Sequence, residues 1–309
     1  MKDLIILGNG MAGMTAALYA KRANLNFKLV GKDEYDFGQI GNAILVENFP
    51  CAASQSGFEL ASSLHDQLIN NNIQIEEHGV IKITQAMINH YGLGFHINYA
   101  DGTDDFCKAV IYALGARHRQ LNCKIDKEIP IHYCALCDGA LYKDKTVAVI
   151  GGGDVAFTQA EYLSKICKKV FIIMCDENVT AAPATFNLVS NIDNVYIEYN
   201  YPVDLIGYSK IPSHCRIINK SKDFYFSVDG IFVAIGMIPN TQPIVPSSPI
   251  ITDTLGYIQA DENCRTKING FFAAGDVRTK SVRQAVTAAA DGANAVNSVI
   301  TYLKGRTDK

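Results

Sequence analysis

Leu4-Ile5-Ile6-Leu7-Gly8-Asn9-Gly10-Met11-Ala12-Gly13 stands near the start of the chain and decides the fold. Its four apolar residues are typical of a buried parallel strand, and three glycines with the spacing G-x-G-x-x-G follow. Residues Thr15 to Arg22 then predict a helix, and Phe27 to Val30 predict the next strand. A glycine turn at this place presents backbone N–H groups and the positive end of a helix dipole, which can hold a pyrophosphate. The spacing alone is weak evidence, because tight strand-to-helix turns also use glycine for steric reasons.

The same pattern returns in the middle of the chain. Thr146-Val147-Ala148-Val149-Ile150 leads into Gly151-Gly152-Gly153-Asp154-Val155-Ala156, followed by a predicted helix over Phe157 to Lys165 and a strand over Val170 to Met174. Two such units predict an α/β chain with two nested Rossmann-like (doubly wound) dinucleotide-binding domains, because each parallel sheet needs helices on its faces. We expect the first domain to comprise residues 1–116 and 240–309, and the second to comprise residues 117–239.

Shorter apolar runs are expected to complete the two domains. A turn is predicted at Asp101-Gly102, and a long alanine-rich helix from about Val282 to Lys304. Residues Gly270 to Asp276 predict a further strand and glycine turn. The other predicted strands are Ile73–Ile83, Phe95–Tyr99, Val110–Ala113, Val195–Glu198, Cys215–Ile218, Phe224–Val228 and Gly230–Ile235.

Length and composition narrow the function classes. The chain has 309 residues, enough for about two domains, with 48% hydrophobic and 19% charged residues and a formal net charge of −3. This composition is that of an ordinary soluble globular protein and gives no support to a nucleic-acid partner. No apolar run reaches the roughly 20 residues of a membrane helix, and the first run is too short for the core of a signal peptide. We therefore expect no membrane association and a cytoplasmic location.

Cys134 and Cys137 are the one closely spaced pair among nine cysteines. An odd, scattered set is not a disulfide framework, whereas a C-x-x-C pair is often redox-active or metal-binding. Cysteines three apart can close a small disulfide ring, and a helix N-terminus or a nearby cation can lower the pKa of one thiol. A zinc site that uses His132 is an alternative, although no second C-x-x-C exists. Two unpaired core cysteines are another, and Asp138 could merely cap a helix.

Segments far apart in the chain make a family resemblance specific. The matching segments are Gly38-Gln39, Val46-Glu47-Asn48-Phe49-Pro50, Ala113-Leu114-Gly115-Ala116, Gly275-Asp276-Val277 and Arg283-Gln284-Ala285. They follow the order and spacing of the low-molecular-weight thioredoxin reductases, which the chain resembles nearly from end to end. The resemblance implies FAD as cofactor, thioredoxin as partner and a homodimeric assembly.

The resemblance also implies roles for individual residues. Cys137 would be the thiol that faces the flavin, Cys134 the thiol that attacks the partner disulfide, and Asp138 the proton donor. Asp276 would accept a hydrogen bond from the FAD ribitol. Gln39 and Asn48 would lie near the flavin ring, and Gln284 with Ala285 would border its pyrimidine edge. The full predicted set of FAD-binding residues is Gly8, Gly10, Met11, Ala12, Gly13, Gln39, Asn48, Gly275, Asp276, Arg283, Gln284 and Ala285. No acidic residue for the ribose stands clearly at the end of the second strand, where Asp33 is the nearest candidate.

The segment after the second glycine turn departs from the family pattern. NADPH-dependent thioredoxin reductases carry a basic cluster there, because the 2'-phosphate has up to two negative charges. Here Met174-Cys175-Asp176-Glu177-Asn178-Val179-Thr180 contains no arginine, lysine or histidine. About two charge-assisted hydrogen bonds, at roughly 1.5 to 3 kcal/mol each, are lost. The sequence therefore predicts reduced ferredoxin as the donor and resembles most the ferredoxin-dependent flavin thioredoxin reductases. NADH, held through Asp176, is the alternative.

Two other classes of function are weighed against a reductase. The first is a redox sensor or thioredoxin-binding module with a structural flavin and no turnover. The second is a ferredoxin-NADP-type reductase, whose relatives lack the cysteine pair.

A disulfide reductase requires the cysteine pair to touch the flavin and also to meet a protein in solvent. We therefore expect a hinge at the two crossings between the domains, near Arg117 to Leu121 and Met237 to Pro243.

Overall fold

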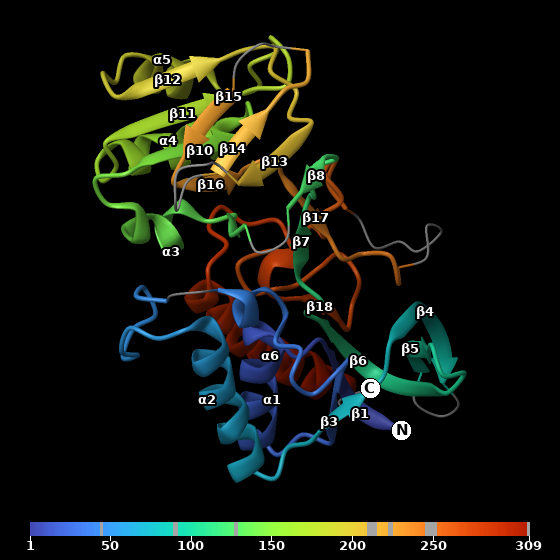
Figure 1. Ribbon diagram of the computed structural model, residues 1–309. Helices are drawn as coiled ribbons and strands as arrows, with labels where there is room; N and C mark the ends of the chain where they lie inside the picture. Colours follow the sequence, from blue (N-terminus) through green and yellow to red (C-terminus); the bar gives the residue numbers. More distant parts are fainter. Residues whose placement is uncertain are drawn as a thin grey trace. The chain divides into compact units, whose positions relative to one another are not determined.

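The computed structural model describes residues 1–43, 46–88, 92–126, 129–208, 215–221, 225–244 and 252–307. The chain forms two compact units, one made of Met1–Arg117 with Ile238–Lys309 and the other of His118–Met237 (Figure 1). The chain leaves the first unit once and returns to it once. The two connecting segments pair as short strands, β7 (Ala116–His118) and β17 (Met237–Pro239).

A largely parallel sheet forms the centre of the first unit. In the described part of the chain its order is β3-β2-β1-β6-β5-β4, with β18 also paired to β6. Strands β4 and β5 run antiparallel to their neighbours, and the others are parallel. The bounds are β1 (Lys2–Leu7), β2 (Phe27–Gly31), β3 (Ile75–Glu77), β4 (Val80–Ile88), β5 (Gly92–Tyr99), β6 (Asp104–Tyr112) and β18 (Phe271–Ala273). Leu4 to Leu7 are completely buried, as expected for a strand between two covered faces.

Three helices of the first unit lie side by side in Figure 1: α1 (Met11–Arg22), α2 (Gly57–Asn70) and α6 (Ala285–Thr307). The apolar residues of α1 and α6 share one core with β1 and β6. Helix α2 starts at a capping box, in which Glu59 N–H donates to Ser56 Oγ at 3.2 Å and Ser56 N–H donates to Glu59 Oε2 at 2.8 Å. Two short 3-10 helices, η1 (Gly38–Asn42) and η3 (Gly275–Val277), complete the unit.

The second unit contains a parallel and a mixed sheet. The parallel sheet has the order β12-β11-β10-β16-β9, and the second sheet has the order β15-β14-β13-β8. The bounds of the strands are β8 (Lys124–Ile125), β9 (Ile131–His132), β10 (Thr146–Ile150), β11 (Lys169–Ile173), β12 (Val195–Glu198), β13 (Leu205–Tyr208), β14 (Cys215–Ile218), β15 (Tyr225–Val228) and β16 (Gly230–Val233). The helices are α3 (Ala135–Asp138), η2 (Gly139–Tyr142), α4 (Asp154–Ser164) and α5 (Pro183–Ser190).

Several predicted elements differ in extent from the observed ones. The strand predicted over residues 73–83 is two strands, because the chain turns between β3 and β4, where His78 N–H donates to the Gly31 carbonyl at 2.8 Å. Helix α1 starts at Met11, inside the glycine turn, rather than at Thr15. Strand β15 starts at Tyr225, and Phe224 lies outside the described residues. Helices α2 and α5 were not predicted, although the capping-box pattern of Ser56 and Glu59 is a signal for α2.

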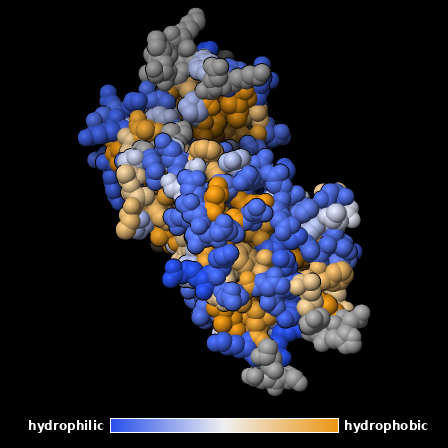
Figure 2. Space-filling model, turned by 90° about the horizontal axis from the view of Figure 1, so that it is seen from below, coloured by the Kyte–Doolittle hydropathy of each residue, from blue (hydrophilic) through white to orange (hydrophobic). Residues whose placement is uncertain are grey.

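The surface is mixed in character. Figure 2 shows a face on which hydrophilic residues predominate and hydrophobic residues stand between them. Among the helices that the structure describes, none is long and apolar enough to cross a membrane.

Candidate redox centre and cofactor site

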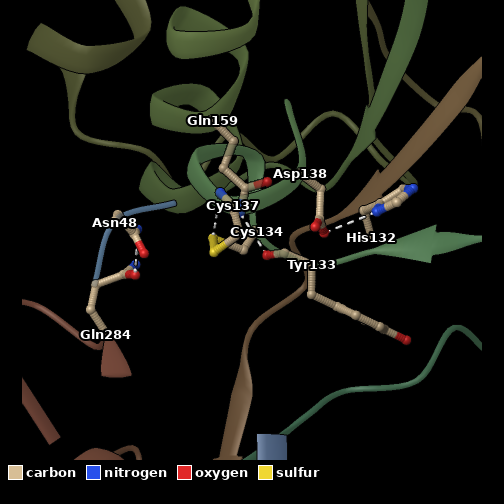
Figure 3. Close-up of a disulfide and its surroundings, with 8 residues drawn as sticks. All are labelled: Asn48, His132, Tyr133, Cys134, Cys137, Asp138, Gln159 and Gln284. Carbon is tan, nitrogen blue, oxygen red and sulfur yellow. Dashed lines mark hydrogen bonds and ion pairs between the residues drawn. A yellow bond between two sulfur atoms is a disulfide. The ribbon is translucent and has the colours of Figure 1, made fainter. Parts of the chain in front are cut away.

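Cys134 and Cys137 are joined by a disulfide at the start of α3, with their Cα atoms 5.3 Å apart (Figure 3). Cys134 is the N-cap of this four-residue helix, and its Sγ accepts a hydrogen bond from Cys137 N–H at 3.2 Å. One helical turn brings residues three apart onto the same side, so the bond closes without a change in the backbone. The two cysteines are therefore a bonded pair and not two separate core thiols.

Asp138 follows this pair and belongs to a buried polar chain. His132, at the end of β9, places Nδ1 at 2.9 Å from Asp138 Oδ2 and Nε2 at 2.7 Å from the Tyr142 hydroxyl. His132 is 2% exposed and Asp138 is 8% exposed. The other carboxylate oxygen, Asp138 Oδ1, is buried and has no hydrogen-bond partner. Asp138 makes no side-chain capping bond to η2, so its side chain is committed to His132.

Gln159 and Tyr142 are two polar side chains of the second unit that were not predicted. Gln159, on α4, donates from Nε2 to the Tyr133 carbonyl at 3.0 Å, while its Oε1 is buried without a partner. Burial raises the pKa of Tyr142 to about 12, with nearby acidic groups including Asp138 adding to the effect. The signal for His132 was its polar side chain in an apolar segment, two residues before the first cysteine. Gln159 carried no such signal, because only the packing of α3 against α4 brings it near.

The first glycine turn joins β1 to α1 as predicted. A Cβ at Gly13 would lie 1.7 Å from the Gly8 carbonyl oxygen, so this approach of helix to turn requires glycine. Gly10 is the N-cap of α1, and no side chain caps the first turn, which contains Met11 and Ala12 and no acidic residue. The N–H groups at this end of α1 are thus available for an anion.

The structure brings several distant predicted FAD-binding residues into contact within the first unit. A Cβ at Gly275 would lie 3.0 Å from Ala12 Cβ, so η3 lies against the start of α1. Asn48 Nδ2 donates to Gln284 Oε1 at 3.2 Å, directly before Ala285 begins α6 (Figure 3). Gln39 Nε2 donates to the carbonyl of Ala116.

Two buried polar atoms near η3 lack partners. Asp276 Oδ1 and Arg283 Nε are both buried without a hydrogen bond. Burial raises the pKa of Asp276, although Lys280 and Arg283 act in the opposite direction. Buried unpaired polar groups are costly, so a bound ligand that completes them is favoured. Asp276 Oδ1 can accept from ribitol hydroxyls, and the free N–H groups at the start of α1 can hold a pyrophosphate. Both features fit FAD. Asp33, the ribose candidate, is exposed and accepts from Tyr35 N–H at 2.8 Å.

A buried ion cluster holds η3 on α6. Asp291 accepts from Arg278 Nε and from Lys280 Nζ, each at 2.9 Å, and from Gly275 N–H at 2.9 Å. Burial by itself would raise the pKa of Asp291, but the hydrogen bonds from Arg278 and Lys280 outweigh it and lower the pKa. This cluster had no signal in the sequence, because its members only meet when α6 packs against η3.

The second glycine turn has the same backbone form but different surroundings. The Gly152 carbonyl accepts from Thr180 N–H at 2.9 Å and from Ala181 N–H at 3.2 Å, so the segment after β11 folds onto the turn. Asp154 stands in the first turn of α4, and its carboxylate accepts from Ala182 N–H at 2.8 Å. A carboxylate at this helix end repels an anion. The second turn therefore differs from the first in having an acidic residue in the first turn of its helix.

Comparison with known proteins establishes the family. The family model "Pyridine nucleotide-disulphide oxidoreductase" matches residues 2–292. Thioredoxin reductase of Mycoplasma genitalium is 37% identical over 305 residues, which cover 96% of this chain and 94% of that protein. The chain belongs to the thioredoxin reductase family. The crystal structure of thioredoxin reductase from Streptococcus pyogenes has 34% identity, covers 99% of both chains and has a TM-score of 0.86.

Members of this thioredoxin reductase family are FAD-binding flavoproteins, so the prediction of FAD is confirmed. The predicted α/β fold with two Rossmann-like domains is confirmed as well. A closer likeness to the ferredoxin-dependent enzymes is not supported. The ferredoxin-flavin thioredoxin reductase of Clostridium acetobutylicum has 23% identity and a TM-score of 0.55, which shows the fold alone.

Proposed function

We propose that the chain is a thioredoxin-disulfide reductase in which the Cys134–Cys137 disulfide would take up two electrons from bound FAD and the resulting dithiol would reduce thioredoxin. The observation that carries the proposal is the bonded pair at the start of α3, next to a buried carboxylate with one free oxygen. Thioredoxin is proposed as the partner because the relatives from Mycoplasma genitalium and Streptococcus pyogenes are named thioredoxin reductases. We assign Cys137 as the flavin-facing thiol, Cys134 as the attacking thiol and Asp138 as the proton donor.

The thiol–disulfide exchange that we propose has three steps. Reduction breaks the S–S bond with two electrons and one proton, and leaves one thiol and one thiolate. The Cys134 thiolate then attacks the partner disulfide and forms a mixed disulfide. Cys137 gives its proton to the thiolate that this attack leaves on thioredoxin, then attacks Cys134, and the intramolecular disulfide reforms. The second thioredoxin thiolate released in this step takes a proton from solvent, so thioredoxin leaves as a dithiol.

Steady turnover tests this assignment against a redox sensor. We expect catalytic reduction of thioredoxin by the wild type and background rates for Cys137→Ser and Cys134→Ser, because each lacks one sulfur of the pair. The matched control is Cys175→Ser, which removes an exposed thiol of the same unit. FAD absorbance should be retained in all three variants. A single stoichiometric reduction without turnover in the wild type would favour the sensor.

We further propose that the first unit is the FAD-binding domain, divided into residues 1–116 and 240–309. The helix N–H groups after Gly8, Gly10 and Gly13 would hold the pyrophosphate, and Asp276 and Arg283 would complete their hydrogen bonds on the cofactor. Residues 117–239 would form the pyridine-nucleotide-like domain that carries the redox pair. Gln39, Asn48, Gln284 and Ala285 would surround the flavin ring, which supplies two-electron chemistry when bound.

For the donor we propose reduced ferredoxin rather than NADPH. Two observations support this: the segment from Met174 to Thr180 has no basic residue, and Asp154 places a carboxylate at the start of α4. A nucleotide-independent donor does not need this helix end. NADH remains the second candidate, because the Gly151-Gly152-Gly153 turn is intact and Asp176 could accept a ribose diol.

Anaerobic mixing of the oxidised flavoprotein with each donor tests this choice. We expect flavin bleaching by reduced ferredoxin within seconds and slow bleaching by NADPH and NADH at the same concentration. Rapid bleaching by NADPH would contradict the argument from the missing basic cluster. Rapid bleaching by NADH alone would establish the second candidate. We also propose that the protein is a homodimer, as the family resemblance implies, and that it is cytoplasmic. Light scattering on the purified protein tests the homodimer.

A further inference from the structure

The buried chain of His132, Asp138 and Tyr142 is not explained by the fold. A histidine that is 2% exposed and a carboxylate that is 8% exposed are costly to bury. An apolar pair would pack at the end of β9 at least as well. Asp138 follows Cys137 directly in the chain, and Figure 3 shows its carboxylate bonded to His132.

The hydrogen bonds determine the protonation pattern of this chain. Burial raises the pKa of Tyr142 to about 12, so its hydroxyl keeps its proton and can donate to His132 Nε2. With Nε2 as the acceptor, His132 Nδ1 donates to Asp138 Oδ2. This arrangement gives both ring nitrogens of His132 a partner.

One atom is left over, Asp138 Oδ1, which is buried and unpartnered. Because the hydrogen bond from His132 holds Oδ2, the carboxylate of Asp138 cannot rotate freely and exchange the positions of its two oxygens. We propose that His132 is a positioning residue that holds Asp138 through Oδ2, so that Oδ1 is the atom that exchanges a proton with the redox pair. Tyr142 fixes the imidazole from the other side.

The proposal deepens the proposed function and names the path of one proton. When the disulfide is opened by a two-electron reductant, the sulfurs take up both electrons and one proton passes through Oδ1 to one sulfur. When the dithiol closes again on a partner disulfide, the proton returns by the same atom. Neither His132 nor Tyr142 touches a reacting sulfur in this scheme.

The pH dependence of thiol alkylation tests the proposal without flavin turnover or thioredoxin. The protein is reduced with dithiothreitol, and the dithiothreitol is removed. The thiols are then alkylated with iodoacetamide at a series of neutral and alkaline pH values. Peptide mass spectrometry then follows Cys134, Cys137 and, as an internal standard, the exposed Cys175. The measured alkylation midpoint does not depend on the electron donor or on thioredoxin. The role of His132 can therefore be disproved while the proposed function holds.

We expect the midpoint of alkylation of the redox pair to move to lower pH by about one unit in His132→Leu. Loss of the donor removes a hydrogen bond that stabilises the charged carboxylate, and a neutral Asp138 no longer opposes a thiolate beside it. His132→Asn keeps a donor near the position of Nδ1, so its midpoint should lie close to that of the wild type. His96→Gln is the matched control, since His96 also pairs with a carboxylate, Asp104, but in the first unit.

The double variant decides whether His132 acts through Asp138. Asp138→Asn should shift the midpoint in the same direction, and His132→Leu should add nothing in that background. An equal further shift, or no shift in His132→Leu alone, would overturn the proposal. If His132→Leu does not fold, Tyr142→Phe and His132→Asn give the same comparison, with a smaller shift expected for Tyr142→Phe and almost none for His132→Asn. No shift in Tyr142→Phe would then overturn it.

Discussion

The two glycine turns of this chain share a local sequence pattern and differ in almost everything around it. The first turn leads into α1 with no acidic residue in its first helical turn, and unpartnered polar atoms of Asp276 and Arg283 lie in the same unit. The second leads into α4 with Asp154 at its start, and its Gly152 carbonyl is bonded to the segment after β11. A glycine fingerprint therefore predicts the turn, but not the charges and contacts that surround it.

The largest expected effect comes from adding one methyl group to each turn. In Gly13→Ala the new Cβ would lie 1.7 Å from the Gly8 carbonyl oxygen, which cannot move aside. In Gly152→Ala it would lie 2.9 Å from the end of the flexible Met174 side chain. We expect Gly13→Ala to lose bound FAD and about 3 kcal/mol of unfolding free energy, and Gly152→Ala to lose about 1 kcal/mol or less. Flavin absorbance and urea unfolding measure both; equal losses would erase the contrast between the turns.

The buried carboxylate of Asp291 offers the next test, because it holds η3 beside the first turn. Asp291→Asn should cost about 3 kcal/mol, since it leaves Arg278 and Lys280 buried without their counter-charge. The pKa of Asp291 is lowered in the folded protein. Its stabilisation is therefore present above the ordinary carboxyl value of 3.8 and is lost as pH falls through the lower folded pKa.

Urea unfolding at a series of acidic pH values measures this contribution. The difference between wild type and Asp291→Asn should be constant near neutral pH and shrink below the ordinary value. A difference that grows in acid would contradict the sign. Asp253→Asn, an exchange of an aspartate elsewhere in the same unit, serves as the comparison.

A smaller effect is expected from Asp276, the unpartnered acceptor of the first unit. Asp276→Ala should weaken FAD binding by about 10- to 100-fold, because one hydrogen bond to a charged group contributes roughly 1.5 to 3 kcal/mol. Asp154→Ala, the equivalent change at the second turn, should leave FAD affinity unchanged. Titration of the apoprotein with FAD, followed by fluorescence, measures both. Equal affinities for wild type and Asp276→Ala would remove this residue from the cofactor site.

The smallest effect concerns the charge at the start of α4. Asp154→Asn removes one negative charge from a helix N-terminus, worth about 0.3 to 1 kcal/mol to an anion. Bleaching of the flavin by NADH should become about two- to fivefold faster, whereas Asp193→Asn, at an exposed site of the same unit, should have no effect. An unchanged rate in Asp154→Asn would show that its carboxylate is not what keeps the nucleotide away.

Much of the architecture was predictable because it depends on short patterns. The apolar runs Leu4–Leu7 and Val147–Ile150 stand directly before glycine turns, and both strands pair in parallel with their neighbours. The break between β3 and β4 was missed because Ile73 and Ile75 before it and Val80, Ile81 and Ile83 after it were read as one strand. The predicted roles of the individual FAD-binding residues stay predictions, although the structure gathers several of them in one unit.

The sequence by itself determined the repeated strand–turn–helix unit, the C-x-x-C pair and the absence of a basic cluster after β11, because each depends on residues close together in the chain. The tertiary structure alone decided which polar groups are buried together. His132 with Asp138 and Tyr142, and Asp291 with Arg278 and Lys280, are ordinary residues in the sequence. Their chemistry arises from removal from water, and removal from water is a property of packing between segments that the chain separates.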